Sequence, residues 1–415
     1  MQASRKLGGR GAPWYPGVMP TALVFSVPAV GHVHPTLPIV AELVRRGTRV
    51  VYYCGEEMRP KIEATGAEFR RIAWEYGHLF AARLSSVTQL ALEQVRSVEA
   101  WMPELLLEIA RLGPDYILND FMALWGRVAA RALGLPLVTF CSSFALGKDV
   151  LPPAALMTAL DVGISPRRAA MLRALRRESA RLSRRYPIRP MKTPLGMFAM
   201  DGDLVLVATS RSFQPKSEDY DDRFQFVGPC FAPRAGDAAT GLPPLDDRPL
   251  VYVSLGTVFN RDTAFFERCA RAFEDGRYQV IMSVGKHGQY VSAAARHPHI
   301  HAMPYVPQLE VLSRAALFIT HGGMNSTAEG ICNEVPLLVA PQGADQFVVA
   351  RRIEETGVGR KLSFWHRSPK RLRALVDEVV GDQQIRVRAR ELHRSFVEAG
   401  GPMRAADVLQ SIGRG

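Results

Sequence analysis

Cysteine is scarce in this sequence, and the five cysteines that occur lie far apart. They form no CxxC pair and are odd in number: Cys54, Cys141, Cys230, Cys269 and Cys332. Disulfide frameworks and zinc knuckles need closely spaced cysteines, so we expect neither to organise this chain. This use of cysteine is typical of a protein that works in a reducing cytoplasm.

Long hydrophobic runs are also missing. No stretch approaches the roughly 18 consecutive apolar residues that suggest a membrane-spanning helix. Residues 1–19 are basic and rich in glycine and proline, but they lack the apolar core of a secretory signal. We expect a disordered extension there, and Met19 is an equally good start for the natural chain.

Acidic residues are fewer than basic ones. The 415 residues include 52 Lys and Arg against 40 Asp and Glu, which gives a net charge of +12. This excess favours anionic partners, among them nucleotides, nucleic acids and acidic membrane surfaces, without choosing among them. Otherwise the composition is that of a globular protein with sizeable cores, since 47% of the residues are hydrophobic and 22% are charged.

Short apolar runs alternate with amphipathic segments from residue 21 onward. Residues 21–27 predict a buried strand, residues 35–47 a helix that opens at a proline and ends at Gly47, and residues 48–54 the next strand. Residues 230–249, rich in Gly, Pro, Ala and Asp, interrupt this rhythm like a linker, and it restarts at residue 250. The pattern predicts two α/β halves, each a doubly wound parallel sheet, facing each other across a cleft.

Two loops of the first half are candidates for a site, because ligands of open parallel sheets bind beyond the carboxyl ends of the strands. One loop carries His32 and the other carries Asp120. A carboxylate that holds one imidazole nitrogen leaves the other nitrogen free to act as a base. From their positions in the sequence alone, His32 and Asp120 are also compatible with a purely structural role.

The second half contains a sharper signal in residues 319–330, ITHGGMNSTAEG. A strand end, two glycines and a helix start follow one another there, and the N–H groups and dipole of a helix start attract anions. An ordinary glycine turn before an N-capped helix has equal weight. This stretch is neither a P-loop nor a GxGxxG fingerprint, which argues against ATPase and nicotinamide-dependent activities.

Six segments in the same order resemble the family 1 glycosyltransferases of the GT-B fold, in particular the bacterial macrolide-glycosyltransferase type. These are FSVPAVGHVHPTLPIVAELVRRG, PDYILND, VYVSLGT, YVPQLEVL, FITHGGMNSTAEGICNEVPLLVAPQGADQ and GGPMRAADVL. The resemblance implies two Rossmann-like domains, an acceptor domain at residues 20–229 and a donor domain at residues 250–398. It further implies a linker at residues 230–249 and a segment at residues 399–415 that crosses back.

The resemblance also implies roles for single residues. His32 is expected to be the general base that deprotonates the acceptor hydroxyl, with Asp120 as its orienting partner. The donor diphosphate is expected to contact Ser254, Gly256, Thr257, His321, Gly323, Asn325 and Ser326. The rest of the donor is expected to contact Val306 and Gln308 at the base, Glu329 at the ribose, and Asp345 and Gln346 at the sugar.

Such a set implies a reaction that uses no cofactor and no metal ion, because the helix start near Gly323 would stabilise the leaving diphosphate. We expect inverting transfer of glucose from UDP-glucose to a small hydrophobic macrolide, polyketide or phenol. The alternatives are a TDP-deoxysugar transferase, a glycolipid-forming transferase, a UDP-sugar epimerase or hydrolase, and a non-catalytic sensor. Tyr305 stands before VPQ where many members carry Trp, so the choice between uracil and thymine stays open.

Three other patterns are weighed against simpler interpretations. Asp201-Gly-Asp203 spells the DxD motif of another glycosyltransferase fold, but it precedes a strand and predicts a turn. The alternation HPHIH at residues 297–301 predicts a surface strand edge. The arginine-rich stretch from Arg167 to Arg189 predicts a solvated helix near the acceptor, with peripheral contact to anionic lipid as the alternative and no nucleic-acid partner. The oligomeric state and the acceptor are left open.

Overall fold

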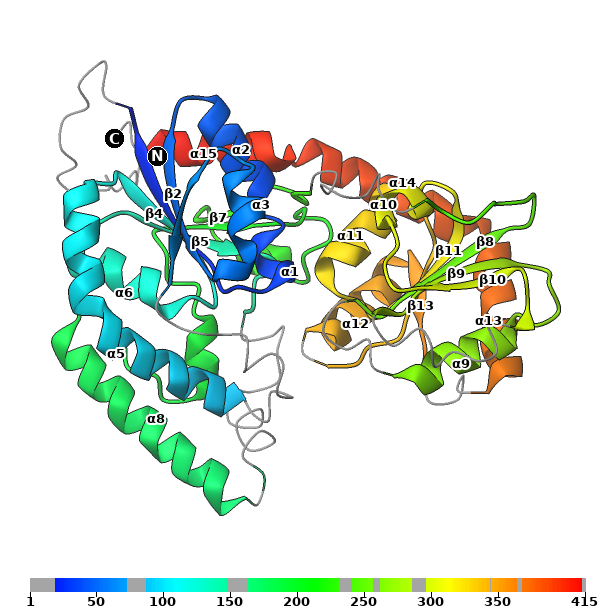
Figure 1. Cartoon of the computed structure of the whole chain (residues 1–415), viewed down its shortest axis with the longest axis horizontal. Coiled ribbons are helices and arrows are strands. Elements are labelled where there is room, and N and C mark those ends of the chain that lie inside the picture. Colours follow the sequence, from blue (N-terminus) through cyan, green and yellow to red (C-terminus); the bar gives the residue numbers. More distant parts are fainter. Residues whose placement is uncertain are drawn as a thin grey trace.

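The computed structural model describes residues 19–72, 87–147, 163, 165–231, 241–256, 262–285, 296–343, 345–363 and 368–412. Within these residues the chain forms two parallel sheets, one in each half, with helices packed around each (Figure 1). The predicted α/β class with two doubly wound domains is therefore confirmed.

The first sheet has seven strands in the order β3-β2-β1-β4-β5-β6-β7, all parallel. The strands are β1 (Thr21–Phe25), β2 (Arg49–Cys54), β3 (Glu68–Arg71), β4 (Tyr116–Asp120), β5 (Leu137–Cys141), β6 (Leu204–Val207) and β7 (Phe224–Phe226). The chain order reverses between β1 and β4, so the carboxyl ends of these two strands are neighbours. Such a reversal is where open sheets bind ligands.

Both faces of the first sheet are buried, which explains why its strands are continuous apolar runs. Leu23 and Phe25 of β1 join one core cluster, whereas Ala22 and Val24 join another. The helical segments are α1 (Val30–Val33), α2 (Leu37–Arg45), η1 (Glu56–Met58), α3 (Arg59–Glu63), α5 (Val87–Leu112), α6 (Leu124–Leu133), α8 (Pro166–Arg185), η2 (Pro194–Phe198) and η3 (Ser217–Asp219).

The second sheet has six parallel strands in the order β10-β9-β8-β11-β12-β13, with its reversal between β8 and β11. The strands are β8 (Leu250–Ser254), β9 (Gln279–Ser283), β10 (Ile300–Met303), β11 (Ala315–Thr320), β12 (Leu337–Val339) and β13 (Gly359–Lys361). The helices are α9 (Thr263–Ala272), α10 (Gln308–Leu312), α11 (Met324–Cys332), α12 (Gln346–Thr356), α13 (Pro369–Gly381), α14 (Gln383–Glu398) and α15 (Gly401–Ile412).

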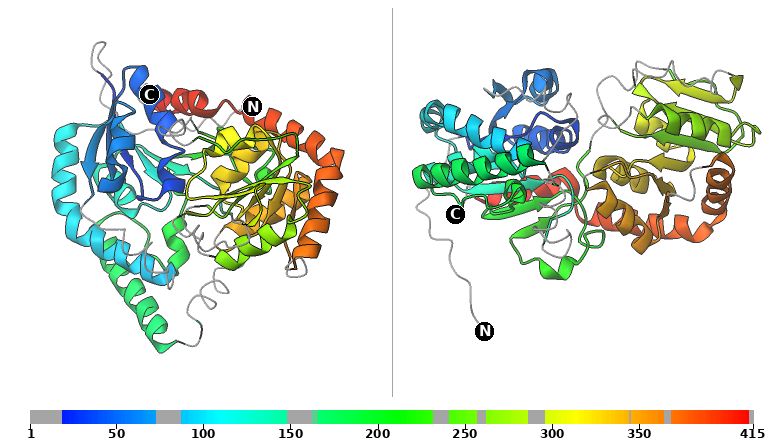
Figure 2. Two further views of the ribbon diagram at one scale, coloured as in Figure 1. Left: turned by 45° about the vertical axis from the view of Figure 1, so that its right-hand side comes forward. Right: turned by 90° about the horizontal axis from the view of Figure 1, so that it is seen from below.

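The last helix lies on the first half of the chain. Helix α14 packs on α11 in the second half, whereas α15 packs on α2 (Figures 1 and 2). Leu409 of α15 is buried in the same core cluster as Val24 of β1, and Arg46 donates to Asp407 at 2.6 Å. The two halves are thus tied together by the carboxyl-terminal segment as well as by the chain between the sheets.

The DxD sequence forms a bend immediately before β6. Asp203 accepts hydrogen bonds from Arg131 at 2.9 Å and from the backbone N–H of Leu137 at 2.8 Å. A carboxylate oxygen of Asp201 lies 3.6 Å from Nε of Arg127. Both carboxylates therefore connect the start of β6 to α6 and β5, as the turn interpretation requires.

The surface-edge interpretation of HPHIH is only partly right. Strand β10 is an edge strand, but it begins at Ile300, so His299 lies before it. The His299 side chain is buried, and its Nε2 forms a hydrogen bond of 2.9 Å with the carbonyl oxygen of Phe273. Phe273 is the C-cap of α9, so His299 forms a hydrogen bond with a carbonyl group at the end of this helix.

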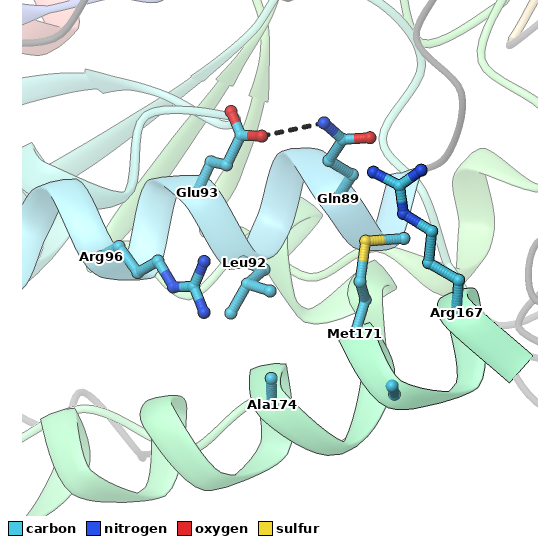
Figure 3. A pocket seen from close by; sticks show the side chains of 8 residues that line it. Gln89, Leu92, Glu93, Arg96, Arg167, Met171 and Ala174 are labelled. Carbon is cyan, nitrogen blue, oxygen red and sulfur yellow. Dashed lines mark hydrogen bonds between the residues drawn. The ribbon is translucent and has the colours of Figure 1, made fainter.

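Helix α8 packs along α5, and this packing accounts for its aliphatic residues. Leu175 and Leu182 are buried in the core beneath, and Glu178 and Arg181 form ion pairs with α5. Figure 3 shows the groove between the two helices, of about 330 Å³ and lined partly by Leu92 and Met171. Among the described residues, no helix is long and apolar enough to span a membrane.

Candidate active site

His32 and Asp120 meet at the carboxyl edge of the first sheet. His32 lies in the single turn of α1 after β1, and Asp120 is the last residue of β4. Nδ1 of His32 lies 2.7 Å from Oδ2 of Asp120. The Asp120 side chain is fully buried, whereas the His32 side chain is 18% exposed. The carboxylate engages Nδ1, so Nε2 is the nitrogen left to exchange a proton.

The surroundings of this pair favour the protonated imidazole. Burial lowers the pKa of His32, but the charge and hydrogen bond of Asp120 and the charge of Asp345 raise it, and the result lies above the ordinary 6.5. The other oxygen of Asp120 accepts from the backbone N–H of Met122 at 2.8 Å, which fixes the carboxylate. An imidazole with this pKa is suited to act as a base near neutral pH.

His321 occupies the corresponding place in the second half, directly after β11. A Cβ on Gly256 would come within 2.6 Å of its ring, and a Cβ on Gly323 would also clash with it. These glycines therefore make room for the imidazole of His321. Burial lowers the pKa of His321 to about 4, although a hydrogen bond with the backbone of Ser254 acts in the opposite direction. His321 is thus neutral near pH 7, and its buried Nδ1 has no hydrogen-bond partner among the described residues.

The start of α11 lies next to His321 and has the features of an anion site. Gly323 is its N-cap and provides no side-chain cap. The first backbone bond of the helix runs from the N–H of Thr327 to Gly323 at 2.9 Å, so the preceding turn offers its N–H groups to a ligand. The helix dipole adds to the attraction for negative charge, and Asn325 and Ser326 lie in the same turn.

A buried polar network lies behind this helix start. The side-chain amide of Gln308 donates to Glu329 at 2.5 Å and to Ser326 at 3.2 Å. Its oxygen accepts from the hydroxyl of Tyr252 at 3.1 Å. Val306 is buried close by in the sequence, whereas Tyr305 is 42% exposed. Gln308, which is predicted to contact the nucleotide base, is therefore hydrogen-bonded to Glu329, which is predicted to contact the ribose. Tyr305 is accessible to solvent.

Two hydrogen bonds connect loops of the first half, which carries the predicted general base His32, to predicted donor-binding residues of the second half. The hydroxyl of Ser143, in the loop after β5, donates to Asp345 at 2.5 Å. The side-chain amide of Asn325 donates to the carbonyl oxygen of Gly31, next to His32, at 3.2 Å. The structure thus places His32, Asn325 and Asp345 in one region.

Three predicted donor-binding residues have not yet been placed, namely Gln346, Ser254 and Thr257. Gln346 is buried and turned towards its own loop, where it accepts from the backbone N–H groups of Gln342 at 2.7 Å and Gly343 at 3.2 Å. Ser254 ends β8, and its hydroxyl accepts from the N–H of Gly256 at 3.3 Å. Thr257 lies outside the described residues.

Sequence reasoning missed two polar residues of this region. Ser143 follows β5, so the carboxyl-end rule that selected Asp120 also points to it. Tyr252 is a buried strand residue that nothing in the sequence distinguishes from core. The aromatic residues of the first half that by type suit either an apolar acceptor wall or the core are Phe80, Trp101, Phe121, Trp125, Phe140 and Phe144. Of these, Phe121, Trp125, Phe140 and Phe144 are buried, Trp101 is partly buried, and Phe80 lies outside the described residues.

Comparison with known proteins agrees with the geometry. Residues 279–412 match the family described as Erythromycin biosynthesis protein CIII-like, C-terminal domain. The chain is 32% identical to the uncharacterized UDP-glucosyltransferase YojK of Bacillus subtilis over 95% of this chain and 98% of that one. It is 29% identical to the demethyllactenocin mycarosyltransferase of Streptomyces fradiae over 94% of this chain and 85% of the other.

A solved structure shows the same architecture. The glycotransferase of kitacinnamycin superposes with a TM-score of 0.83 and 28% identity, over 95% of this chain and 99% of that one. The two relatives named above are sugar transferases by name and match over nearly the whole chain, and the solved structure shares the overall fold. The chain therefore belongs to the family 1 glycosyltransferases of the GT-B fold, and it is a hexosyltransferase that uses a sugar donor and a small-molecule acceptor.

Proposed function

We propose that this enzyme catalyses inverting, metal-independent O-glycosylation, with His32 as the general base and Asp120 as its orienting partner. The observation that carries the proposal is the 2.7 Å contact between Nδ1 of His32 and Asp120 in the region that also holds Asn325 of α11. A base and an anion-binding helix start are the two functions that sugar transfer from a nucleotide requires.

The proposed reaction is a single displacement. The acceptor hydroxyl gives its proton to Nε2 of His32 while its oxygen forms a bond to the anomeric carbon. The bond from that carbon to the diphosphate oxygen breaks on the opposite face, and the diphosphate leaves with the electron pair. The uncapped N–H groups at the start of α11 stabilise its negative charge, and neutral His321 adds a hydrogen-bonding group.

UDP-glucose is the donor that we propose. The support is the relative named as a UDP-glucosyltransferase, which matches over almost the entire chain. Buried Glu329, held by Gln308, is suited to accept hydrogen bonds from two ribose hydroxyls, and exposed Tyr305 offers a ring for the nucleotide base. A TDP-deoxysugar is the second candidate, supported by the similarity to a mycarosyltransferase. We propose a small hydrophobic macrolide, polyketide or phenol as the acceptor.

A lipid acceptor has weaker support. The aliphatic residues of α8 that suggested a membrane-binding helix pack against α5, which leaves the exposed arginines as the part available to an anionic surface. Peripheral contact through Arg167 to Arg189 would therefore be electrostatic and sensitive to salt.

Replacing His32 by Ala tests the proposed base. We expect the turnover number to fall by about 10²-fold or more, because general-base catalysis contributes that much. The dissociation constant for UDP, measured by calorimetry, should stay the same, because His32 lies on the first half of the chain. His34→Ala is the matched control, since His34 lies in the same loop and forms a hydrogen bond with Lys61 instead. Unchanged turnover in His32→Ala would contradict the assignment.

A matrix of nucleotide sugars and acceptors, read by mass spectrometry with EDTA present, separates the remaining candidates. Glucosylated product from UDP-glucose supports the first donor, and product from TDP-deoxysugars alone supports the second. Consumption of UDP-sugar without any acceptor would favour an epimerase or hydrolase. Loss of product on addition of EDTA would contradict metal independence.

A further inference from the structure

The ring of Phe121 stacks on the imidazole of His32. The ring centroids lie 5.5 Å apart and the two planes differ by 20°. Phe121 directly follows Asp120, so one short segment supplies both neighbours of the imidazole. The backbone N–H of Phe121 donates to the carbonyl oxygen of Phe140 at 2.9 Å, and its side chain is only 6% exposed. The register between β4 and β5 therefore fixes where this ring lies.

A second layer supports the Phe121 ring from behind. The ring of Phe198, at the end of η2, lies 6.0 Å from it. Buried Arg127 holds η2 in place by donating to the carbonyl oxygens of Gly196 at 3.2 Å and Met197 at 2.7 Å. Arg127 of α6 is thus connected to His32 through two successive aromatic rings.

We propose that Phe121 is a positioning residue for His32. Its ring keeps the imidazole in line with Asp120 and stabilises the imidazolium that forms when His32 takes the acceptor proton. A flat ring against an imidazole limits its tilt, and the face of an aromatic ring attracts a cation. The inference rests on the proposed role of His32 as base, and Phe121 itself is not assigned any contact with the substrate.

Within the described part of the chain, two carboxylates act on the charge of His32. Asp120 contacts it from β4, and the charge of Asp345 reaches it from the start of α12. Tyr52, Cys54 and Cys141 are titratable groups that interact electrostatically with Asp120, and burial raises the pKa of all three, so they stay neutral at working pH. Replacing Phe121 by an apolar residue therefore changes the environment of the imidazole without changing any neighbouring charge.

The test is to replace Phe121 by Leu and to measure the pKa of His32 in the free enzyme by NMR. The resonance is assigned by its absence in His32→Gln. We expect the pKa of His32 to fall by about half a pH unit, because a face-on ring stabilises a cation by roughly that much. The acid limb of the kcat/KM profile should move to lower pH by the same amount, and kcat should fall about tenfold. Phe121→Tyr keeps the aromatic ring, so its His32 pKa and its kcat should both stay close to those of the unmodified enzyme.

Phe224→Leu is the matched control, because Phe224 packs against the same core cluster as Phe121, while its ring contacts Tyr220 and the guanidinium of Arg223. Should Phe121→Leu not fold, Phe121→Met takes its place, because the unbranched side chain of methionine adapts to irregular gaps in a core. An unchanged pKa of His32, or the same shift in Phe224→Leu, would overturn the proposal. A fall in kcat without a pKa shift would overturn it as well. The NMR arm needs no turnover, so it gives a result even if the His32→Ala test rejects the base.

Discussion

Two histidines of the proposed site lie in opposite electrostatic environments. The pKa of His32 lies above 6.5 because two carboxylates outweigh the effect of burial. The pKa of His321 lies near 4 because burial lowers it and, among the residues that the structure describes, no carboxylate compensates. The first can gain and lose a proton near neutral pH, and the second stays neutral. This difference agrees with the separate roles proposed for them, a base and a hydrogen-bonding group at the diphosphate.

The pH dependence of activity follows from the sign of the His32 shift. Only the neutral imidazole can act as a base, so kcat/KM should fall as the pH drops through a pKa above 6.5. Asp120→Asn removes the charge that raises this pKa, so the acid limb should move to lower pH, and kcat should fall by about 10²-fold or more. Rate measurements from pH 5 to 9 check both effects. A limb that stays in place would show that another group controls it.

Residue types and strand ends together made this pair predictable. His32 and Asp120 follow two strands that a reversal of chain order makes neighbours, and a general rule for parallel sheets selects both loops. The same rule also selects Ser143, but no pattern of residues pairs it with Asp345, since their contact crosses between the two halves. The position of the Phe121 ring depends on strand register, which the residue pattern does not show.

At the scale of single elements, the segment from β11 to α11 combines three structural features of the proposed donor site. The strand ends at the sheet edge, His321 fills the turn, and the helix starts without a side-chain cap. Gly256, from the neighbouring turn after β8, has a φ of +73° and faces the same imidazole. These elements can come this close only because glycine lacks a Cβ.

Gly256→Ala should therefore damage donor binding. Alanine is strained at this φ by about 1–2 kcal/mol, and its Cβ would displace the ring of His321. We expect the dissociation constant for UDP to rise about tenfold or more, since each 1.4 kcal/mol corresponds to a factor of about ten. Isothermal calorimetry measures this. Gly241→Ala is the control, because a Cβ there meets nothing within 4 Å. Unchanged UDP binding in Gly256→Ala would contradict the proposed contact region.

Helix α8 shows how far an amphipathic pattern can be interpreted. Its sequence interleaves arginines with the apolar residues Met171, Leu172, Leu175 and Leu182, but this amphipathic pattern does not say whether the apolar side meets lipid or protein. The structure gives α5 as the partner, through buried Leu175 and Leu182 and the ion pair of Arg181 with Glu99. The pattern of a single helix contains no information about which surface will cover it.

At the scale of the whole molecule, the carboxyl-terminal segment connects the two halves. Arg46 of the first half contacts α15 through Asp407, and Ser210 forms a hydrogen bond of 2.8 Å with Ser395 of α14. We propose domain limits at residues 20–229 and 250–398, with the described part of residues 399–415 structurally part of the first domain. Each proposed range contains all strands of one sheet.

Leu409→Ala tests this last assignment. Leu409 is fully buried against the first domain, so its truncation should lower the free energy of unfolding of that domain by about 2–5 kcal/mol. Hydrogen exchange followed by mass spectrometry should show the loss of protection in β1 and α2 and none in the second sheet. Met403→Ala is the control on the same helix, because Met403 is 63% exposed. Loss of protection confined to the second domain would refute the assignment.

The sequence by itself determined the two α/β halves, the first strands and helix near residues 21–27, 35–47 and 48–54, and the residue types at the strand ends. These properties depend on local pattern, because apolar runs, prolines and glycines act within a few residues. Only the tertiary structure decided that Ser143 binds Asp345, that Phe121 stacks on His32, that two glycines make room for His321, and that α15 returns to the first half. Each of these contacts joins residues far apart in the chain or depends on register and packing, and no local pattern specifies them.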